Sequence, residues 1–347
     1  MKEPLVNIII PVFNVDINLF EKCINSVFHQ NYHNIEIIVI DDGSKERYAN
    51  EIDAVCRKHS GIILKRKKNE GVSLARNYAL KECKGEYIIF LDADDYFFDE
   101  NAVSSAVNIA IKYEADIVIG QVALDFGENN LVKEQYIFSN EESVLEKDDE
   151  LENISSHFLS YSLLKSAPYL TGLRRGIASR VFSRKCIEEL CFNSKFKYGE
   201  DSFFDYQATK KASKVVLTNS VWYVYYQRHS SAIHQVEFEE ALTHFDELVK
   251  IVPRSELFLV YERVANLVLH IATQQARKKG FQKKIKEILS DERVLFSLNN
   301  RKEQLFSEPL WKSMLFRCLR KNKPFLFVAL IKMACKISDV INKRRKR

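Results

Sequence analysis

The sequence predicts an α/β protein in which a mostly parallel β-sheet is flanked by helices, followed by an additional α-helical C-terminal domain. Three observations lead to this fold class. Short apolar runs alternate with segments of helical periodicity over about the first 120 residues, and such a β-α-β series implies a parallel sheet with right-handed crossovers. Several of these runs end directly in acidic or polar residues. From about Glu237 onward, apolar residues recur every three or four positions, which is typical of helices.

Composition and cysteine usage limit the class of protein. With 347 residues, 46% hydrophobic and 29% charged, the chain is long enough for two or three globular domains. Its seven cysteines are an odd number without C-x-x-C pairs, and the first residues lack a charged region followed by a long apolar one. We therefore expect a reduced, cytoplasmic protein without a disulfide framework. No apolar run is long enough for a membrane-spanning helix.

The β-strands are expected where apolar residues form uninterrupted runs, because strands covered on both faces show no alternation. These runs are residues 6–10, 35–40, 62–64, 88–91 and 116–120. Pro11 cannot extend the first strand, so we expect that strand to end before it. Helices fill the intervals, and the first begins near Asn18, a candidate N-cap. Its apolar residues are expected in the core: Phe20, Ile24, Val27 and Phe28.

A cluster of three acids, Asp92, Asp94 and Asp95, directly follows the strand at residues 88–91. Open α/β sheets bind ligands at the carboxyl ends of their strands. Carboxylates this close repel one another unless a cation bridges them, and Asp-X-Asp is suited to Mg²⁺ or Mn²⁺ carrying phosphates. The alternative is an acidic turn that caps the next helix. An EF-hand is a weaker interpretation, because the loop lacks the required Gly and Glu.

The strand at residues 35–40 also ends in acids, at Asp41 and Asp42, and is followed by Gly43. Such a segment suits a nucleoside site, in which a carboxylate accepts from a base N–H or a ribose hydroxyl and the glycine allows close approach. A plain turn is the alternative. Arg76 lies in the first turns of a later helix, where it could reach a phosphate or a base, or form a surface salt bridge.

Four motifs, in this order and at these spacings, resemble the nucleotide-binding domain of glycosyltransferase family 2, which has the GT-A (Rossmann-like) fold. The motifs are IIIPVFN, IEIIVIDDGS, NEGVSLARNYAL and GEYIIFLDADDYF. The resemblance covers roughly the first 235 residues. It implies that a sugar nucleotide, typically a UDP-sugar, lies across the strand ends. The implied nucleotide-sugar contacts come from Pro11, Phe13, Asn14, Asp42, Gly43, Arg76, Asp92, Ala93 and Arg228.

The resemblance also implies individual roles within this set. Pro11 and Phe13 would line the base pocket, and Asp42 would hydrogen-bond the uracil. Arg76 would help to hold the nucleotide, and Asp92 would face the ribose or the sugar.

The same resemblance implies a divalent cation, Mn²⁺ or Mg²⁺, as the cofactor. Asp94 would coordinate it where it bridges the diphosphate, and His229 is a candidate second ligand. Arg228 and His229 occupy the place of a family loop, Tyr-Tyr-Arg-x-Arg/His-x-x-Ser, that closes over the diphosphate. The match departs from that pattern at Gln227, and a plain surface loop is the alternative. Trp222, just before it, could stack on a sugar or pack in the core.

An acid pair, Glu200 and Asp201, precedes an apolar helical pattern. Such a pair is also an ordinary stabiliser of a helix dipole. Family 2 enzymes place a Glu-Asp-x-x-Phe motif here, and the resemblance implies that Asp201 is the general base, with Glu200 orienting the base or the acceptor. Inverting transfer requires an activated acceptor hydroxyl, for which a carboxylate base is suited. Upstream, Arg180 stands in a segment that departs from the family's Trp-x-Lys-Leu-like element.

Three segments are expected: a nucleotide-sugar-binding half at residues 1–120, an acceptor-binding and catalytic half at 121–235, and a helical domain at 236–347 with a basic amphipathic tail. Residues 311–347 hold twelve Lys or Arg and one Asp, a net +11, which leaves −6 for the rest of the +5 chain. Such a tail suits an anionic membrane surface. Nucleic-acid binding is one alternative, although no nucleic-acid module accompanies the tail. The other is a helix packed on the domain with a charged end and no partner.

These observations predict an inverting, metal-dependent hexosyltransferase that moves a hexose or N-acetylhexosamine from a UDP-sugar to a glycan, lipid-linked or protein-linked acceptor. The expected setting is bacterial surface polysaccharide, lipooligosaccharide or glycoprotein synthesis at the cytoplasmic face of the membrane, without a nucleic-acid partner. One alternative is a non-catalytic sugar-nucleotide-binding scaffold subunit. Another is a nucleotidyltransferase, which would release pyrophosphate.

Overall fold

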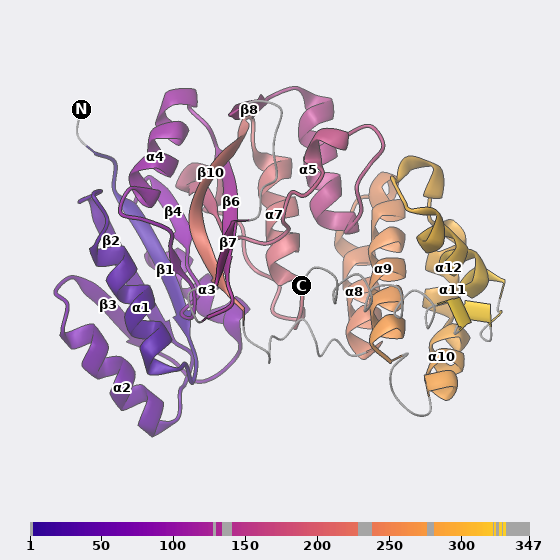
Figure 1. Ribbon diagram of the computed structural model, residues 1–347, viewed down its shortest axis with the longest axis horizontal. Helices are drawn as coiled ribbons and strands as arrows, with labels where there is room; N and C mark the ends of the chain where they lie inside the picture. The colour runs from indigo at the N-terminus through magenta and orange to yellow at the C-terminus, as the bar shows by residue number, and fades with distance from the viewer. Residues whose placement is uncertain are drawn as a thin grey trace. The chain divides into compact units, whose positions relative to one another are not determined.

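The computed structural model describes residues 3–127, 130–133, 141–227, 238–275, 281–321, 323, 326–327 and 329–330. The chain divides into two units (Figure 1). The first comprises Met1–Ser155, Tyr169–Ser194 and Gly199–His229, and the second comprises Ser156–Pro168, Lys195–Tyr198 and Ser230–Arg347. The three-part division expected from the sequence stays a prediction.

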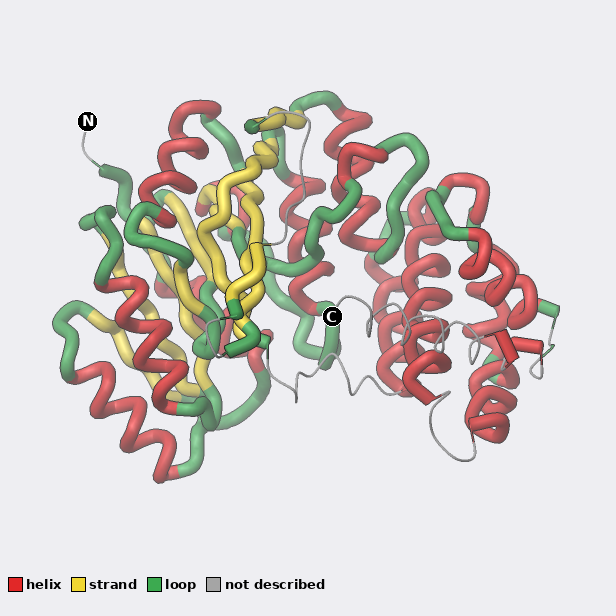
Figure 2. The backbone as a smooth tube through the Cα atoms, viewed as in Figure 1, coloured by secondary structure: helices red, strands yellow, loops and turns green. Residues whose placement is uncertain are grey.

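The first unit is built on one β-sheet, drawn in yellow in Figure 2. Its strands are β1 (Val6–Val12), β2 (Ile35–Asp41), β3 (Ile62–Arg66), β4 (Tyr87–Phe90), β5 (Tyr96–Phe97), β6 (Ile117–Asp125), β7 (Leu131–Lys133), β8 (Glu142–Leu145), β9 (Arg180–Ser183) and β10 (Val215–Tyr226). The main path runs β3-β2-β1-β4-β9-β6-β10-β5. Neighbours from β3 to β4 are parallel, as are β6 and β10, whereas β9 runs antiparallel to both β4 and β6. The predicted α/β fold class, a central sheet flanked by helices, is confirmed, but the sheet is mixed, because β5, β7 and β8 also pair antiparallel to their neighbours.

Helices of the first unit follow the strands as the sequence indicated. They are α1 (Ile17–Phe28), α2 (Glu46–Arg57), α3 (Val72–Glu82), α4 (Ala102–Tyr113), α5 (Asp148–Ser160), α6 (Arg184–Ile187) and α7 (Glu200–Lys211), with the last residues of α5 counted in the second unit. Two details of α1 differ from expectation. Its N-cap is Asp16, whose carboxylate accepts from the backbone N–H of Asn18. Phe28 is exposed and stacks on His59 instead of entering the core.

Strand β1 continues through Pro11, so the prediction that it ends before this proline is wrong. The backbone groups of successive residues in a parallel strand point to alternate neighbours. The carbonyl of Ile9 faces β4 and that of Val12 faces β2, so the side of Pro11 that lacks an N–H faces β4. The pairing of β1 with β4 ends at Ile9, and no ladder bond is lost.

The second unit is helical, which confirms the periodicity expected from the sequence. Its helices are α8 (Phe238–Ile251), α9 (Leu257–Gln275), α10 (Phe281–Ser290), α11 (Glu292–Asn300) and α12 (Leu310–Arg320). An apolar cluster that includes Val264, Val268 and Leu319 forms its core. Beside this core, the buried carboxylate of Glu262 accepts from Arg301 at 2.8 Å and from the hydroxyl of Ser162 at 2.6 Å. Buried charges are tolerated there because each has a partner.

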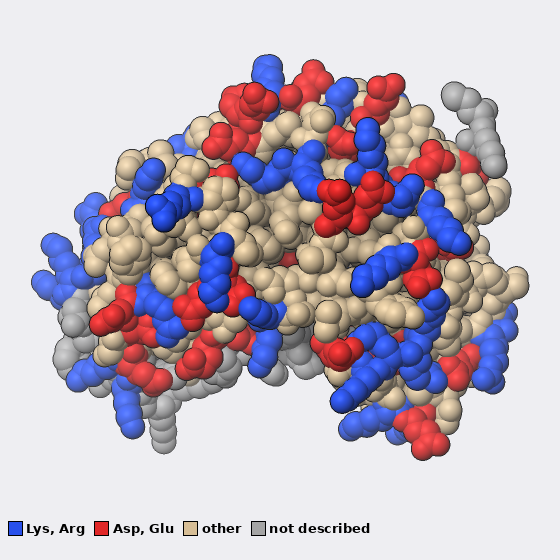
Figure 3. Space-filling model, turned by 180° about the vertical axis from the view of Figure 1, so that it is seen from behind, with Lys and Arg blue, Asp and Glu red and all other residues tan. Residues whose placement is uncertain are grey.

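The described part of the chain shows features that bear on membranes and thiol chemistry. No helix there combines the length and the apolar character that crossing a bilayer requires. The cysteines described are free thiols. On the face drawn in Figure 3, acidic and basic side chains are interspersed. The charged tail from residue 331 onward lies outside the described residues.

Candidate active site

Polar side chains gather where β1, β2 and β4 end, because the carboxyl ends of parallel strands share one edge of a sheet. β2 ends at Asp41, and β4 is followed within two residues by Asp92. Helix α7 brings Glu200 to the same place from the other half of the first unit. Site residues that are far apart in the sequence are therefore neighbours in one unit.

Arg76, on α3, bridges the two acidic motifs. Its guanidinium donates to the carboxylate of Asp92 at 2.8 Å and to that of Glu200 at 3.0 Å. The arginine side chain is only 5% exposed, and its Nε has no hydrogen-bond partner among the described residues. Burial lowers the pKa of Arg76, but the carboxylates of Asp92, Glu200 and Asp201 outweigh burial and raise it overall. The arginine is thus a permanent positive charge between the two acids, not a surface salt bridge.

Glu200 is held in a different electrostatic state from an ordinary surface glutamate. Burial and the neighbouring charge of Asp201 raise the pKa of Glu200 to about 7, although Arg76 opposes this shift. Near neutral pH, Glu200 therefore exists in both protonation states. A group of this kind can orient a neighbour by donating or by accepting a hydrogen bond.

The three acids after β4 have different environments. Asp95 is buried and accepts from the Tyr223 hydroxyl at 2.6 Å and from the Tyr226 backbone N–H at 2.9 Å. Burial, followed by the charges of Asp94 and Asp92, raises its pKa well above the ordinary value. Asp92 is offset by Arg76, so the repulsion that suggested a cation is relieved in part by the protein itself. Asp92 and Asp94 remain partly exposed.

The residues after β2 hold a loop of the protein against the sheet. The carboxylate of Asp42 accepts from the Lys67 ammonium at 2.7 Å and from the backbone N–H groups of Glu70 and Gly71 at 3.1 and 2.7 Å. A side chain at Gly43 would lie 2.6 Å from the backbone nitrogen of Asn69. The close approach that this glycine allows is therefore to the chain's own β3–α3 loop. A uracil contact by Asp42 stays a prediction.

The loop after β1 is fastened to the loop after β2. Asn14 has a positive φ of 44°, its backbone N–H donates to Ser44 Oγ at 2.9 Å, and its side-chain oxygen accepts from the Lys45 N–H at 2.9 Å. Phe13, between this loop and Pro11, is 48% exposed. An exposed ring at the mouth of a strand edge is available for stacking on a base.

Asp205 and Gly176, which were not predicted as site residues, lie close to Asp201. Asp205 lies one helical turn after it on α7, is buried, and accepts from the Gly176 N–H at 3.0 Å. Burial raises the pKa of Asp205 to about 7, with Arg180 opposing and Asp201 adding to the shift. The four-residue spacing of Asp201 and Asp205 was a signal for a shared helix face.

Trp222 is buried, so its sugar-stacking alternative gives way to core packing.

The predicted site for a divalent cation depends on the carboxylate oxygens of Asp92 and Asp94. Within the described residues, no three His, Cys, Asp or Glu side chains group closely enough to hold an ion. Asp94 and Asp92 offer partly exposed carboxylate oxygens, which fit a hard cation that takes one or two protein ligands and completes its shell with phosphate and water. Arg228 and His229 lie outside the described residues, so their predicted roles stay predictions.

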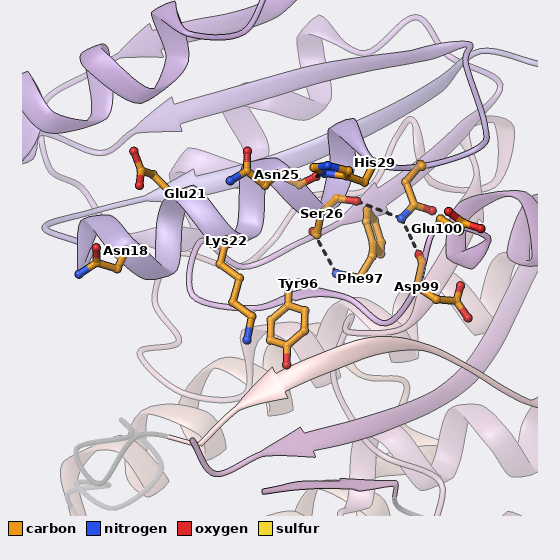
Figure 4. A pocket seen from close by; sticks show the side chains of 11 residues that line it. Asn18, Glu21, Lys22, Asn25, Ser26, His29, Tyr96, Phe97, Asp99 and Glu100 are labelled. Atoms are coloured by element: carbon orange, nitrogen blue, oxygen red, sulfur yellow. Dashed lines mark hydrogen bonds between the residues drawn. The ribbon is translucent and has the colours of Figure 1, made fainter. Parts of the chain in front are cut away.

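A pocket of about 500 Å³ lies between α1 and the β5 segment, with Lys22, Ser26 and Tyr96 among its lining residues (Figure 4). The Ser26 hydroxyl accepts from the Phe97 N–H at 3.1 Å, and the Lys22 ammonium lies 3.6 Å from the centroid of the Tyr96 ring. None of the predicted site residues lines this pocket. We assign it no ligand.

The raised pKa of Glu200 leads to a pH-dependent prediction. Because the folded protein binds this proton more tightly than the unfolded chain, the contribution of Glu200 to stability is present below about pH 4.5 and is lost as pH rises through about 7. Glu200→Gln cannot ionise. We expect its melting temperature, relative to that of the parent, to rise between about pH 5 and about pH 8 and then level off. Parallel melting curves for the two proteins across this range would contradict the assigned pKa.

Comparison with known proteins gives consistent results. The family model for glycosyl transferase family 2 matches residues 7–182. Glycosyltransferase GlyA of Streptococcus pneumoniae serotype 4 is 28% identical over 226 residues, which cover 65% of this chain but only 31% of GlyA. The uncharacterized glycosyltransferase EpsJ of Bacillus subtilis is 25% identical over 309 residues, covering 84% of this chain and 85% of EpsJ.

A solved structure extends the fold comparison to nearly the whole chain. S. aureus TarS residues 1–349, in complex with UDP-GlcNAc, aligns with a TM-score of 0.66 at 14% identity. The alignment covers 96% of this chain and 92% of the TarS chain. At this identity the likeness concerns the fold alone. Together with the family match over half of its length, these findings show that the chain belongs to glycosyltransferase family 2 and is a sugar-transferring enzyme with the GT-A fold.

Proposed function

We propose that this enzyme is an inverting, metal-dependent transferase that moves a hexose or N-acetylhexosamine from a UDP-sugar to a glycan, lipid-linked or protein-linked acceptor in bacterial surface glycan synthesis. One observation carries the proposal: buried Arg76 joins Asp92, at the end of the central strand, to Glu200, beside the candidate base. The UDP-GlcNAc complex of TarS, which shares this fold, supports a UDP-sugar as the donor.

In this proposal, the residues at the strand ends bind the donor. The exposed ring of Phe13 stacks on the base, while Asp42 and Arg76 hold the nucleotide end. Asp94, with Asp92 beside it, holds Mn²⁺ or Mg²⁺, which when bound supplies charge neutralisation for the leaving diphosphate. Asp92 also faces the ribose or the sugar. Arg76 orients Asp92 by donating to its carboxylate at 2.8 Å.

The chemical step depends on Asp201. Its carboxylate accepts the proton of the acceptor hydroxyl, whose oxygen attacks the anomeric carbon in line with the departing UDP. One attack from the opposite face inverts the anomeric configuration. Glu200 orients the base or the acceptor, because its pKa of about 7 lets it both donate and accept near neutral pH. The acid pair is therefore more than a helix cap.

Two alternatives differ from this proposal in what the protein releases. A scaffold subunit would bind UDP without turnover, and a nucleotidyltransferase would release pyrophosphate. The half-exposed Asp201, with its own positioning contacts, favours a transferase over a scaffold.

The test is a UDP-release assay of the purified protein with a panel of UDP-sugars in Mn²⁺, Mg²⁺ or EDTA. We expect slow release of UDP from one donor even without an acceptor, and loss of that release in EDTA. UDP binding by calorimetry in the same samples separates the alternatives. Pyrophosphate release would contradict the proposal, and tight UDP binding without release from any donor or with any acceptor extract would favour the scaffold.

We further propose that the enzyme works at the cytoplasmic face of an anionic membrane and contacts it through α12. Leu310, Trp311 and Met314 are 85, 55 and 50% exposed, and the helical spacing places Arg317 and Lys321 on the same stripe. Exposed Trp and Leu beside basic residues suit the interface of anionic lipids, where each basic residue adds about 1 kcal/mol. The basic residues on this stripe support an anionic lipid surface as the partner.

Replacing both Leu310 and Trp311 with Ser is expected to weaken binding to vesicles of phosphatidylglycerol and phosphatidylcholine at least about tenfold, because two apolar side chains no longer leave water. Cosedimentation measures this change. Ile251→Ser, at an apolar residue of α8 about as exposed as Trp311 (51% against 55%), is the control and should bind as the parent does. Equal binding of the parent to phosphatidylcholine alone, or unchanged binding of the double variant, would contradict the proposed surface.

A further inference from the structure

We propose that Gly176 is a positioning residue that sets the place of the Asp201 carboxylate, and that Asp205 and Arg180 hold Gly176 there. This inference rests on the proposed role of Asp201 as the general base. It adds a requirement beyond the acid motif: the residue that faces the Asp201 carboxylate must be a glycine.

Both carboxylate oxygens of Asp201 have close neighbours. Oδ1 accepts from the backbone N–H of Ser202 at 2.6 Å. Oδ2 lies against Gly176, where an added Cβ would stand 2.5 Å from it, well inside van der Waals contact. One oxygen is thus held by a backbone N–H at the start of α7, and the other occupies space that is open only because residue 176 has no side chain.

Gly176 is itself fastened to the helix that carries the base. Its N–H donates to Asp205 Oδ2 at 3.0 Å, and Asp205 lies one turn after Asp201 on α7. The buried guanidinium of Arg180 donates to the carbonyl oxygens of Ala178 and Arg174 at 3.0 and 2.6 Å and lies 3.5 Å from Asp205. The loop is therefore closed around Arg180 and anchored on α7. Because Asp205 and Asp201 lie on the same helix, α7, the loop that carries Gly176 is held at a set distance from the base.

A methyl group at residue 176 would be accommodated by movement of the carboxylate, because the clashing atoms are the end of a side chain and not backbone. Such a movement costs little stability. It does, however, rotate the base away from the acceptor hydroxyl, and a misplacement of about 1 Å can lower a rate about 100-fold. The structure thus separates the expected effect on rate from the effect on stability.

Gly176→Ala tests the inference against Gly61→Ala. Both glycines have a positive φ, +108° and +93°, so both substitutions carry backbone strain, but nothing lies within 4 Å of a Cβ at Gly61. We expect Gly176→Ala to lower kcat at least about tenfold relative to Gly61→Ala, with the donor KM and UDP affinity within about twofold of it. The two variants should have similar melting temperatures.

A second variant covers the case in which Gly176→Ala does not fold. Asp205→Asn keeps an oxygen for the Gly176 N–H but loses the charge opposite Arg180, and it should lower kcat with an unchanged donor KM. Parent-like kcat in either folded variant, or a loss of donor affinity equal to the loss of kcat, would overturn the inference. If Asp201→Asn also retained transfer, the proposed base would fail as well. If Asp201→Asn lost transfer while Gly176→Ala kept it, only the positioning role would fail.

Discussion

Asp201→Asn is expected to lower the rate of sugar transfer by about 10²–10⁴-fold, the range that a general base contributes. Asn has nearly the same shape as Asp and can still accept from the Ser202 N–H, but it cannot take a proton from the acceptor hydroxyl. UDP affinity should remain within about twofold of the parent value, because the donor contacts come from other elements. Transfer rates with saturating donor, together with calorimetric UDP binding, measure both effects.

The control for this variant is Asp291→Asn, at the N-cap of α11. Like Asp201, Asp291 accepts a hydrogen bond from a backbone N–H at the start of a helix, in this case that of Arg293. The substitution therefore repeats the loss of a charge at a helix start, but in the second unit. It should leave the transfer rate unchanged. Full transfer by the Asp201 variant would remove the assignment of the base, whatever its effect on stability.

Asp94→Ala is expected to abolish the metal dependence of donor binding. Without this carboxylate the divalent cation loses its main proposed protein ligand, so the UDP affinity in Mn²⁺ should fall at least about tenfold, towards the value that the parent shows in EDTA. Transfer should fall further, because the leaving diphosphate is no longer neutralised. Calorimetry with and without EDTA gives the comparison.

Asp95→Ala, at the next residue, is the matched contrast to Asp94→Ala. Asp95→Ala removes the acceptor of the buried Tyr223 hydroxyl and of the Tyr226 N–H, and a buried donor left unpaired costs stability. We therefore expect a lower melting temperature for Asp95→Ala than for the parent, while the metal dependence of UDP binding is kept. A metal response that survives in the Asp94 variant would show that another residue holds the cation.

Strands β1, β2, β4 and β6 could be predicted because they are largely covered on both faces and therefore read as unbroken apolar runs. Strand β9 did not give this signal. It begins at Arg180, whose side chain is buried by pairing with carbonyl oxygens and Asp205, and a charged residue does not predict a strand in the middle of a sheet. Its antiparallel direction also broke the β-α-β pattern.

The chemistry of the site was less predictable than its location. Neighbouring carboxylates look alike in a sequence, so nothing distinguished Asp95, which turns inward to Tyr223, from Asp94. The pair of Arg76 with Glu200 spans 124 residues and is set by how α3 and α7 meet the sheet. Likewise, Gly43 approaches the Asn69 backbone, a contact that depends on a loop conformation. These features arise from tertiary packing, not from local residue preference.

The Arg76 bridge has a consequence for exchanging parts between relatives. Consider a chimaera that joins residues 1–120 of this chain to the later half of another transferase. It would keep Arg76 and Asp92, but the acid that pairs with the other nitrogen of Arg76 would come from the second parent. Where that parent lacks an acid at the position of Glu200, a buried cation would be left with half of its compensation. Donor and acceptor preferences of this enzyme are therefore better altered by substitutions that leave all three residues in place than by exchanging whole halves.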